Sequence, residues 1–253
     1  MRKIRAVCCS HTGNVRPRNE DNYTFCRDLL RTGSPQKEEA ELAAFGTKAA
    51  FGVFDGMGGL RESERASACA AETFRTLMKK SGGAAGCSGE FLRQCCMEIN
   101  ADVCALFDEL GHTTGTTGVL LYLKRKNYAV ANVGDSPAFL YRNCHLRKIF
   151  QEHSDRLLIE QLGLRKSPSL TQHLGLPPEN MELDPFSAGD RSYLGDRFVL
   201  CTDGLTSAVP EEEIEAICHD HKDTADCVAA LVKAALNAGG TDNITVIVCD
   251  VVE

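Results

Sequence analysis

Residues 51–59 read Phe51-Gly-Val-Phe-Asp-Gly-Met-Gly-Gly59, an apolar run that ends in one acidic residue among glycines. The apolar run predicts a buried strand, and the Asp-Gly step predicts an abrupt change of chain direction after it. Because glycine lets other groups approach the main chain closely, Asp55 would stand at a strand end beside accessible carbonyl groups. Such a place suits a hard divalent cation. Taken alone, however, the stretch is more typical of an ordinary Asp-Gly hairpin turn.

The same arrangement occurs again further along the chain. Val199-Leu-Cys-Thr-Asp-Gly204 is an apolar run that ends at Asp203, and Gly239-Gly-Thr-Asp-Asn-Ile-Thr-Val-Ile-Val248 places Asp242 before a very apolar strand. A fourth acid, Asp135, follows the run at 128–134. If these strands share one core, their acidic ends can converge. Carboxylates brought together must raise their pKa values or hold a cation, and oxygen ligands favour Mg²⁺ or Mn²⁺ over Zn²⁺, with Ca²⁺ also compatible.

Composition and charge exclude several classes of protein. The 253 residues are 43% hydrophobic and carry a net charge of −7, and the only dense basic run, Lys124-Arg-Lys126, falls at an expected hairpin turn. Nucleic acid is therefore not expected as the main partner. No apolar run is long enough for a membrane span, and no signal-type segment follows the basic start, so a cytoplasmic protein is expected. The 13 scattered cysteines contain no CxxC pair, which argues against a zinc framework or a disulfide scaffold.

Hydrophobic periodicity predicts an α+β protein with one domain over residues 1–253. Helices are expected at 63–80, 90–110, 155–163, 210–218 and 224–237, and strands at 4–10, 22–26, 51–54, 116–123, 128–134, 138–141, 146–149, 197–202 and 244–252. The four strands between 116 and 149 are interpreted as one antiparallel meander. Residues 27–48 are interpreted as a surface insertion, with a short helix or a disordered segment over 36–44. Helices grouped in pairs between runs of strands favour a sheet-on-sheet core with helices outside.

The acidic strand ends suggest a two-metal hydrolytic site. One carboxylate would bridge two ions, a shared water with a lowered pKa would be the nucleophile, and the ions would neutralise a phosphoryl group under attack. Such a site needs an arginine to grip the phosphate with its planar guanidinium group. Arg16 is the best placed candidate, because it lies in the charged loop before Glu20 and Asp21. This scheme requires no covalent enzyme intermediate.

At this point the chain resembles the metal-dependent serine/threonine protein phosphatases of type 2C, in their compact bacterial form. The ordered set of matching segments covers essentially the whole chain, which makes the resemblance specific. The segments are Thr12-Gly-Asn-Val-Arg-Pro-Arg-Asn-Glu-Asp21, Val53-Phe-Asp-Gly-Met-Gly-Gly59, Gly115-Thr-Thr117, Asn132-Val-Gly-Asp-Ser136, Glu152-His-Ser154, Gly195-Asp-Arg-Phe-Val-Leu-Cys-Thr-Asp-Gly-Leu205 and Gly239-Gly-Thr-Asp-Asn-Ile-Thr-Val246.

The resemblance implies a four-layer α-β-β-α sandwich of two packed antiparallel sheets with helices on both outer faces. It implies two Mn²⁺ or Mg²⁺ ions and a weaker third ion, and substrates that are phosphorylated proteins, the targets of a serine/threonine kinase. A monomer without nucleic acid or a membrane span is expected. The same resemblance implies that Asp55 bridges the two ions, that the Gly56 carbonyl binds one of them, and that Asp203 and Asp242 bind the other. It implies that Asp135 and Asp203 hold the third ion. It also implies that the catalytic Arg16 binds the substrate phosphate and that Glu20 and Asp21 contact the ions through water.

The chain departs from the family pattern at four places. His11 stands where bacterial members usually carry Asp, and Pro137 replaces an Arg. Met57 and Leu60 fill the two places where a His is usual, so a metal-bound water would have to protonate the leaving alcohol. The segment 155–170 is short for the flap of bacterial relatives, which leaves substrate choice open.

Two alternatives stand beside the phosphatase hypothesis. One is a catalytically weak or inactive relative that serves as a binding or regulatory module, although the intact Asp55, Asp203 and Asp242 argue against it. The other is the same chemistry on a regulatory phosphoprotein of a sporulation or sigma-factor switch. Metal-dependent turnover of a phosphopeptide would separate the phosphatase hypothesis from the first alternative. The second alternative differs from it only in the identity of the substrate protein.

Overall fold

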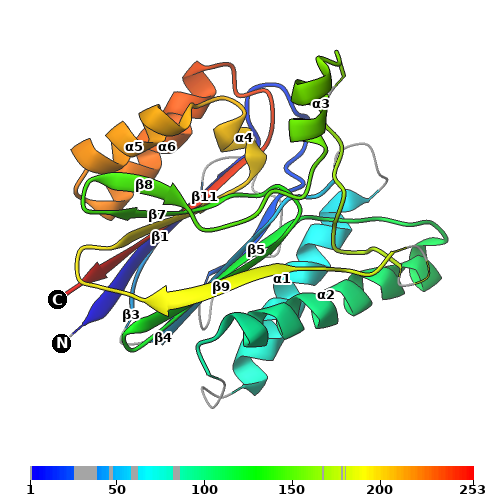
Figure 1. Cartoon of the computed structure of the whole chain (residues 1–253), viewed down its shortest axis with the longest axis horizontal. Coiled ribbons are helices and arrows are strands. Elements are labelled where there is room, and N and C mark those ends of the chain that lie inside the picture. Colours follow the sequence, from blue (N-terminus) through cyan, green and yellow to red (C-terminus); the bar gives the residue numbers. More distant parts are fainter. Residues whose placement is uncertain are drawn as a thin grey trace.

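The structure is a computed structural model that describes residues 2–25, 39–45, 48–57, 62–81, 86–166, 168–177, 179 and 181–253. The described residues form eleven strands and six helices (Figure 1). The strands are β1 (Lys3–His11), β2 (Asn22–Phe25), β3 (Glu39–Phe45), β4 (Lys48–Phe54), β5 (Gly118–Lys124), β6 (Asn127–Val133), β7 (Ala138–Arg142), β8 (His145–Lys148), β9 (Phe186–Arg191), β10 (Arg197–Cys201) and β11 (Ile244–Val252). The helices are α1 (Ser63–Lys80), α2 (Gly89–Leu110), α3 (Arg156–Leu162), α4 (Asp203–Thr206), α5 (Glu211–Asp220) and α6 (Thr224–Asn237).

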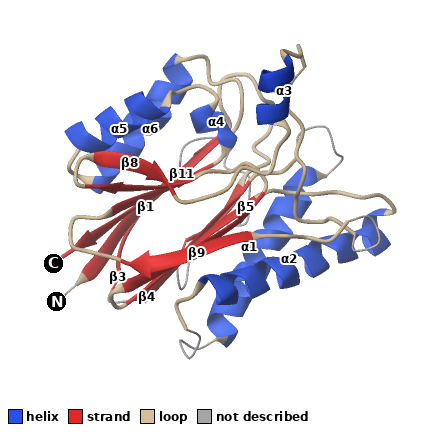
Figure 2. Ribbon diagram, in the orientation of Figure 1, coloured by secondary structure: helices blue, strands red, loops and turns tan. Residues whose placement is uncertain are grey.

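The strands form two antiparallel sheets that pack face to face. One sheet has the order β3-β1-β11-β10-β7-β8 and the other has the order β2-β4-β5-β6-β9. Helices α5 and α6 cover the outer face of the first sheet, and α1 and α2 cover the outer face of the second (Figure 2). The result is the four-layer α-β-β-α sandwich that the sequence predicted.

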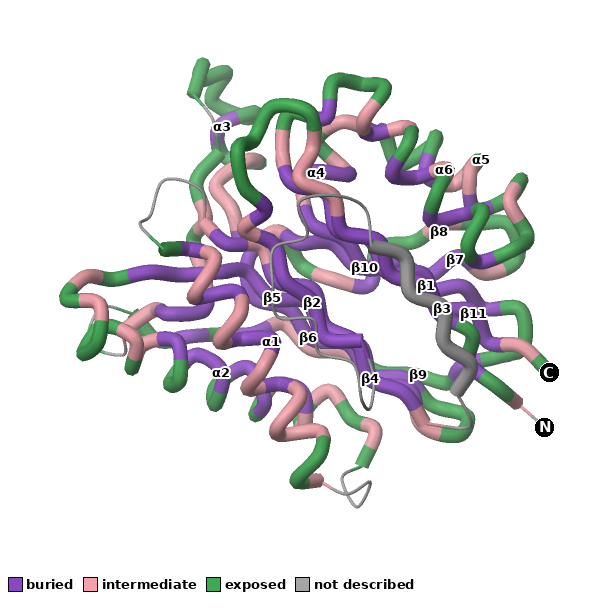
Figure 3. Tube along the Cα trace, turned by 180° about the vertical axis from the view of Figure 1, so that it is seen from behind, coloured by how far each residue is buried: buried purple, intermediate pink, exposed green. Residues whose placement is uncertain are grey.

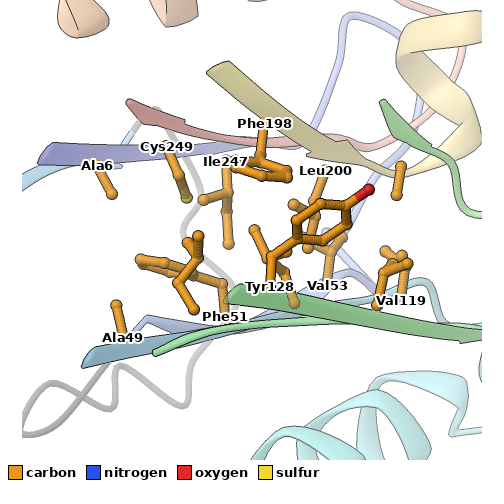
Figure 4. Close-up of a cluster of buried hydrophobic side chains, with 14 of the residues drawn as sticks. Ala6, Ala49, Phe51, Val53, Val119, Tyr128, Phe198, Leu200, Ile247 and Cys249 are labelled. Carbon is orange, nitrogen blue, oxygen red and sulfur yellow. The ribbon is translucent and has the colours of Figure 1, made fainter. Parts of the chain in front are cut away.

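Both faces of the central strands are covered, which explains why these strands are apolar almost throughout. On β4, Phe51 and Val53 point into the core between the sheets (Figure 4), whereas Ala50 and Phe54 pack against α1 and α2. On β11, Ile247 and Cys249 belong to the inter-sheet core, and Val248 packs under α5 and α6. A strand buried on both faces needs apolar residues at consecutive positions rather than at alternate ones. The tube in Figure 3 accordingly shows buried backbone along the middle of both sheets.

Several sequence expectations need correction. The expected surface insertion at 27–48 is wrong in part, because β3 pairs with β1 at the edge of the first sheet and β4 already begins at Lys48. The expected helix over 36–44 is likewise wrong where it overlaps β3, and residues 26–38 and 46–47 lie outside the described part. The expected meander is divided: β5 and β6 pair in one sheet, and β7 and β8 pair in the other. Strand β9 and helix α4 were not predicted.

Candidate metal centre

Five aspartates gather at one end of the sheets, where β4, β6 and β10 end and β11 begins. They are Asp21, Asp55, Asp135, Asp203 and Asp242. Burial raises the pKa of the Asp55 carboxyl well above the usual range, and the negative charges of the other four add to the shift. The structure therefore brings together acids from strand ends that are far apart in the sequence.

Asp55 and Asp203 are near enough for the charge of Asp203 to raise the pKa of the Asp55 carboxyl. Two neighbouring carboxylates repel one another unless one is protonated or a cation lies between them. Burial and Asp242 raise the pKa of Asp203, although the cations Arg156 and Arg16 oppose this shift. The pair is thus poised to accept positive charge.

Asp21 lies buried beside this pair and has one oxygen unused. Its Oδ2 accepts hydrogen bonds from the hydroxyls of Thr202 (3.0 Å) and Thr245 (2.7 Å). Its Oδ1 is buried and has no hydrogen-bond partner within the described part of the chain. Burial is the main reason that the pKa of Asp21 rises to about 7, and the charges of Asp203 and Asp242 add to the shift. Because an orphaned buried carboxylate oxygen is costly, it is suited to a cation or to one of its waters.

The main chain of Asp55 is held by the two threonines of the Gly115-Thr-Thr117 segment. The Thr116 hydroxyl (2.7 Å) and the Thr117 N–H (2.8 Å) donate to the Asp55 carbonyl, and the Asp55 N–H donates to the Thr117 hydroxyl (3.1 Å). The threonines therefore position the acid. The N–H of Gly56 donates to the Glu20 carbonyl (3.2 Å), and a Cβ on Gly56 would lie 2.7 Å from that oxygen. Only glycine fits at this position.

The loop that carries Arg16 is tied to the start of β11 by one side chain, that of Asn243. Its Nδ2 donates to the carbonyls of Thr12 and Arg18, each at 2.8 Å, and its Oδ1 accepts the N–H of Glu20 at 2.8 Å. Asn243 is 5% exposed. A single buried amide thus fixes both ends of the segment that surrounds Arg16.

Arg16 itself lies at the rim of the site and pairs with Asp242. Its Nη2 is 2.8 Å from Asp242 Oδ2, and the two side chains are 41% and 36% exposed. The expected phosphate ligand is therefore within reach of the expected metal ligands. At this exposure the pair is weak, so a stronger ligand for either partner can separate it.

A cavity of about 200 Å³ opens beside Asp135 and Asp203. Its other walls are Pro137, Phe139, Lys148, Phe150, Glu152, Arg156, Thr206, Ser207 and Glu211. Burial and the charge of Asp203 raise the pKa of Asp135 to about 7. The guanidinium of Arg156, at the start of α3, donates to Glu152 at 2.8 Å. Asp135 and Asp203 therefore reach solvent through this cavity, next to the short segment 155–170.

The donor set fits a hard divalent cation. Its members are carboxylates and main-chain carbonyls, which Mg²⁺ and Mn²⁺ prefer. The described residues contain no three acidic, His or Cys side chains that already stand together as a complete ligand group. The raised pKa values and the unused Asp21 Oδ1 still mark the place where a cation would relieve the crowding.

Two histidines, one of them a departure from the family pattern, have structural roles. His153 is buried, its Nδ1 accepts the Gly134 N–H (3.2 Å), and burial lowers its pKa, so it supports a turn. His11 Nδ1 accepts the Gly13 N–H at 2.8 Å and closes the turn before Arg16. Leu60 lies outside the described residues. Sequence reasoning missed Asn243, Thr202 and Thr245, whose only signal is their position beside Asp242 and Asp203.

The chain is similar to known proteins over most of its length. The family model "Protein phosphatase 2C" matches residues 27–238. The chain is 29% identical over 214 residues to "Serine/threonine phosphatase stp" of Listeria monocytogenes, covering 78% of this chain and 82% of that protein. It is 31% identical over 148 residues to "Protein phosphatase PhpP" of Streptococcus pneumoniae, covering 55% of this chain and 59% of that protein.

Among solved structures, the chain is similar to the catalytic domain of the serine threonine protein phosphatase PstP, which was solved in complex with two manganese ions. The TM-score is 0.78 at 25% identity, and the match covers 100% of both chains. Since the family model spans most of the sequence and the fold agrees along its whole length, the chain belongs to the protein phosphatase 2C family of serine/threonine phosphatases, as its motifs predicted.

Proposed function

We propose that this protein hydrolyses phosphoserine and phosphothreonine in other proteins by a metal-dependent mechanism at the aspartate cluster. The observation that carries the proposal is the convergence of four acidic neighbours on Asp55, with Arg16 at the rim of the cluster. The PstP neighbour that holds two manganese ions supports Mn²⁺ or Mg²⁺ as the metal.

In this proposal Asp55 would be a ligand of two ions, the Gly56 carbonyl would hold one of them, and Asp203 and Asp242 would hold the other. Asp135 and Asp203 would hold a weaker third ion. Asp21 and Glu20 would act through water. When bound, such ions lower the pKa of a water and neutralise the charge on a phosphoryl group.

Arg16 binds the substrate phosphate in this proposal. Its guanidinium pairs with Asp242 Oδ2 in the structure, so it is already held at the edge of the cluster. A phosphate dianion offers two oxygens to the planar guanidinium and is a stronger partner than one exposed carboxylate. The exchange of partners would leave Asp242 available for its ion as the substrate arrives.

The proposal treats residues 1–253 as one phosphatase domain. The pairing of β1 with β11 supports this, because the first and last described strands lie side by side in one sheet. We expect a monomer that acts on the targets of a serine/threonine kinase in the cytoplasm. No helix of the described residues is long and apolar enough to cross a membrane.

The test is hydrolysis of a phosphothreonine peptide by the wild type and by Asp203→Asn, with Mn²⁺, with Mg²⁺ and with EDTA. The expected result is turnover that requires metal and is lost in the variant, because Asp203 lies at the centre of the cluster. Asp226→Asn, an exposed change on α6, is the matched control and should keep wild-type turnover. Absence of turnover with either metal, in a folded wild type, would instead favour the binding-module alternative.

A further inference from the structure

One end of the molecule carries a dense group of cations that the phosphatase mechanism does not use. This cationic edge consists of Lys48, Lys124, Arg125, Lys126 and Arg191. Strand register places its members together: Lys48 is paired with Lys124, Lys124 with Asn127, and Asn127 with Arg191. Arg125 and Lys126 form the turn between β5 and β6. On a chain with a net charge of −7, this is a local reversal of sign.

The cationic edge lies at the opposite end of the sheet from the aspartates. Lys48 begins β4, and Asp55 follows the end of the same strand. Seven residues of strand span about 23 Å. In Figure 1 the end of β9 lies on the same side as both chain termini, whereas α3 and α4 lie at the other end. A partner bound at the edge would therefore leave the aspartate cluster accessible.

The arrangement of charges in this edge is unfavourable for folding. Lys48 and Lys124 stand directly opposite one another on neighbouring strands, and like charges in that position are destabilising. Arg125, Lys126 and Arg191 form no ion pair with other described residues. The acid beside the edge is Asp190, whose Oδ1 accepts the Arg191 N–H at 2.6 Å and whose charge raises the pKa of Arg142. Arg125, Lys126 and Arg191 are exposed, so these three cations are available to bind an anion.

An apolar tip adjoins the edge. Tyr193 and Leu194, between β9 and β10, are each 49% exposed. The tip is fixed to the edge because the Ser192 N–H donates to the Lys126 carbonyl (2.9 Å). The Tyr193 ring also packs on the guanidinium of Arg142, with 4.7 Å between the guanidinium carbon and the ring centroid. An aromatic and an aliphatic side chain beside a row of cations match the chemistry of a membrane–water interface.

We propose that the cationic edge and the Tyr193–Leu194 tip dock this phosphatase on the surface of an anionic lipid bilayer. The cations would bind lipid headgroups, and the tip would enter the headgroup layer. The apolar tip favours a bilayer over an acidic polypeptide, because a solvated polyanion gives exposed Leu194 no apolar contact. Docked in this way, the aspartate cluster faces away from the membrane, toward phosphoproteins near its surface.

The experiment is flotation of the purified protein with vesicles of phosphatidylcholine alone and with about 30% phosphatidylserine, at low and at physiological salt. Wild type should float only with the anionic vesicles, and salt should weaken its binding. Arg125→Glu/Lys126→Glu should weaken binding by 100-fold or more, because each cation near an anionic surface contributes about 5-fold and each reversal removes a cation and adds an anion. Leu194→Ser should weaken binding by about 10-fold at both salt concentrations.

Arg165→Glu/Lys233→Glu is the control with the same change of charge, at exposed positions away from the edge. Its affinity for the anionic vesicles should lie within about 5-fold of the wild-type affinity, which is the contribution of a single cation. Peptide hydrolysis by the Arg125/Lys126 variant should be unchanged, which shows that the variant is folded. The proposal is overturned if wild type does not float with anionic vesicles, if both double variants lose binding equally, or if Leu194→Ser binds like wild type. The last result would mean that the cations alone bind the vesicles, so the apolar tip would no longer favour a bilayer over an acidic protein.

Discussion

Replacing Asn243 with Ala should weaken both the fold and the site, because this one side chain ties the Arg16 loop to β11. The change removes three hydrogen bonds of 2.8 Å, two to carbonyls and one from an N–H. A buried hydrogen bond contributes about 1 kcal/mol net, so the loss should be about 3 kcal/mol of the free energy of unfolding. A domain with a typical stability of about 5–15 kcal/mol would remain folded.

The catalytic effect follows from the position of Arg16. Without Asn243 the segment between Thr12 and Arg18 loses its buried anchors and keeps the exposed hydrogen bonds of Asn14 to Leu236, Gly239 and Gly240, so the guanidinium is held less firmly at the rim of the aspartates. A misplacement of about 1 Å can cost about 100-fold in rate, so kcat/KM for a phosphopeptide should fall by about 10- to 100-fold. Most of the loss should appear in KM if Arg16 grips the phosphate equally in the ground state and the transition state.

Urea unfolding and steady-state hydrolysis with Mn²⁺ are the two measurements. Asn243→Asp keeps the acceptor for the Glu20 N–H but turns a carboxylate oxygen toward two carbonyls, so it should be at least as damaging. Asn237→Ala, at the exposed end of α6, should change the free energy of unfolding by less than about 0.5 kcal/mol. A loss below about 1 kcal/mol in Asn243→Ala, together with wild-type kcat/KM, would show that the loop is anchored in another way.

Three further outcomes are expected. Arg197→Met should cost about 3–5 kcal/mol in urea unfolding, because it leaves the Asp250 carboxylate buried without its cation, and Arg197→Met/Asp250→Leu should recover part of that loss. Because burial raises the pKa of Asp21 to about 7, the metal-free folded protein keeps a proton that the unfolded chain releases near pH 4. Its free energy of unfolding should therefore fall as pH rises from about 4 to about 7, by up to about 1.4 kcal/mol per pH unit for each such carboxyl. A urea midpoint that rises over this range would show that burial does not hold a proton on Asp21. Adding Mn²⁺ at pH 7 should raise the urea midpoint of the wild type more than that of Asp203→Asn, and an equal rise in both would mean that the ion binds elsewhere.

The acidic strand ends could be predicted from the sequence because each is marked locally, by an apolar run and a neighbouring glycine. Asn243, Thr202 and Thr245 could not, because their role depends on partners such as Asp21 that lie about two hundred positions away. Strand β3 was missed for a different reason. Its sequence, Glu39–Phe45, is rich in Ala, Glu and Leu, which favour helices, and pairing with β1 overrides that preference. Strand β9 is a partly exposed edge strand with little apolar pattern.

The position of β11 has a consequence for how the molecule is made. This strand is the last of those described, yet it lies inside its sheet between β1 and β10 and is preceded by Asp242. During synthesis β1 can pair with β3 early, but its pairing with β11 must wait for a strand more than two hundred residues away, and such long-range pairing is intrinsically slow. The same step completes the sheet and delivers Asp242 and Asn243 to the cluster. Onset of phosphatase activity should therefore report the end of folding, with no active shorter intermediate.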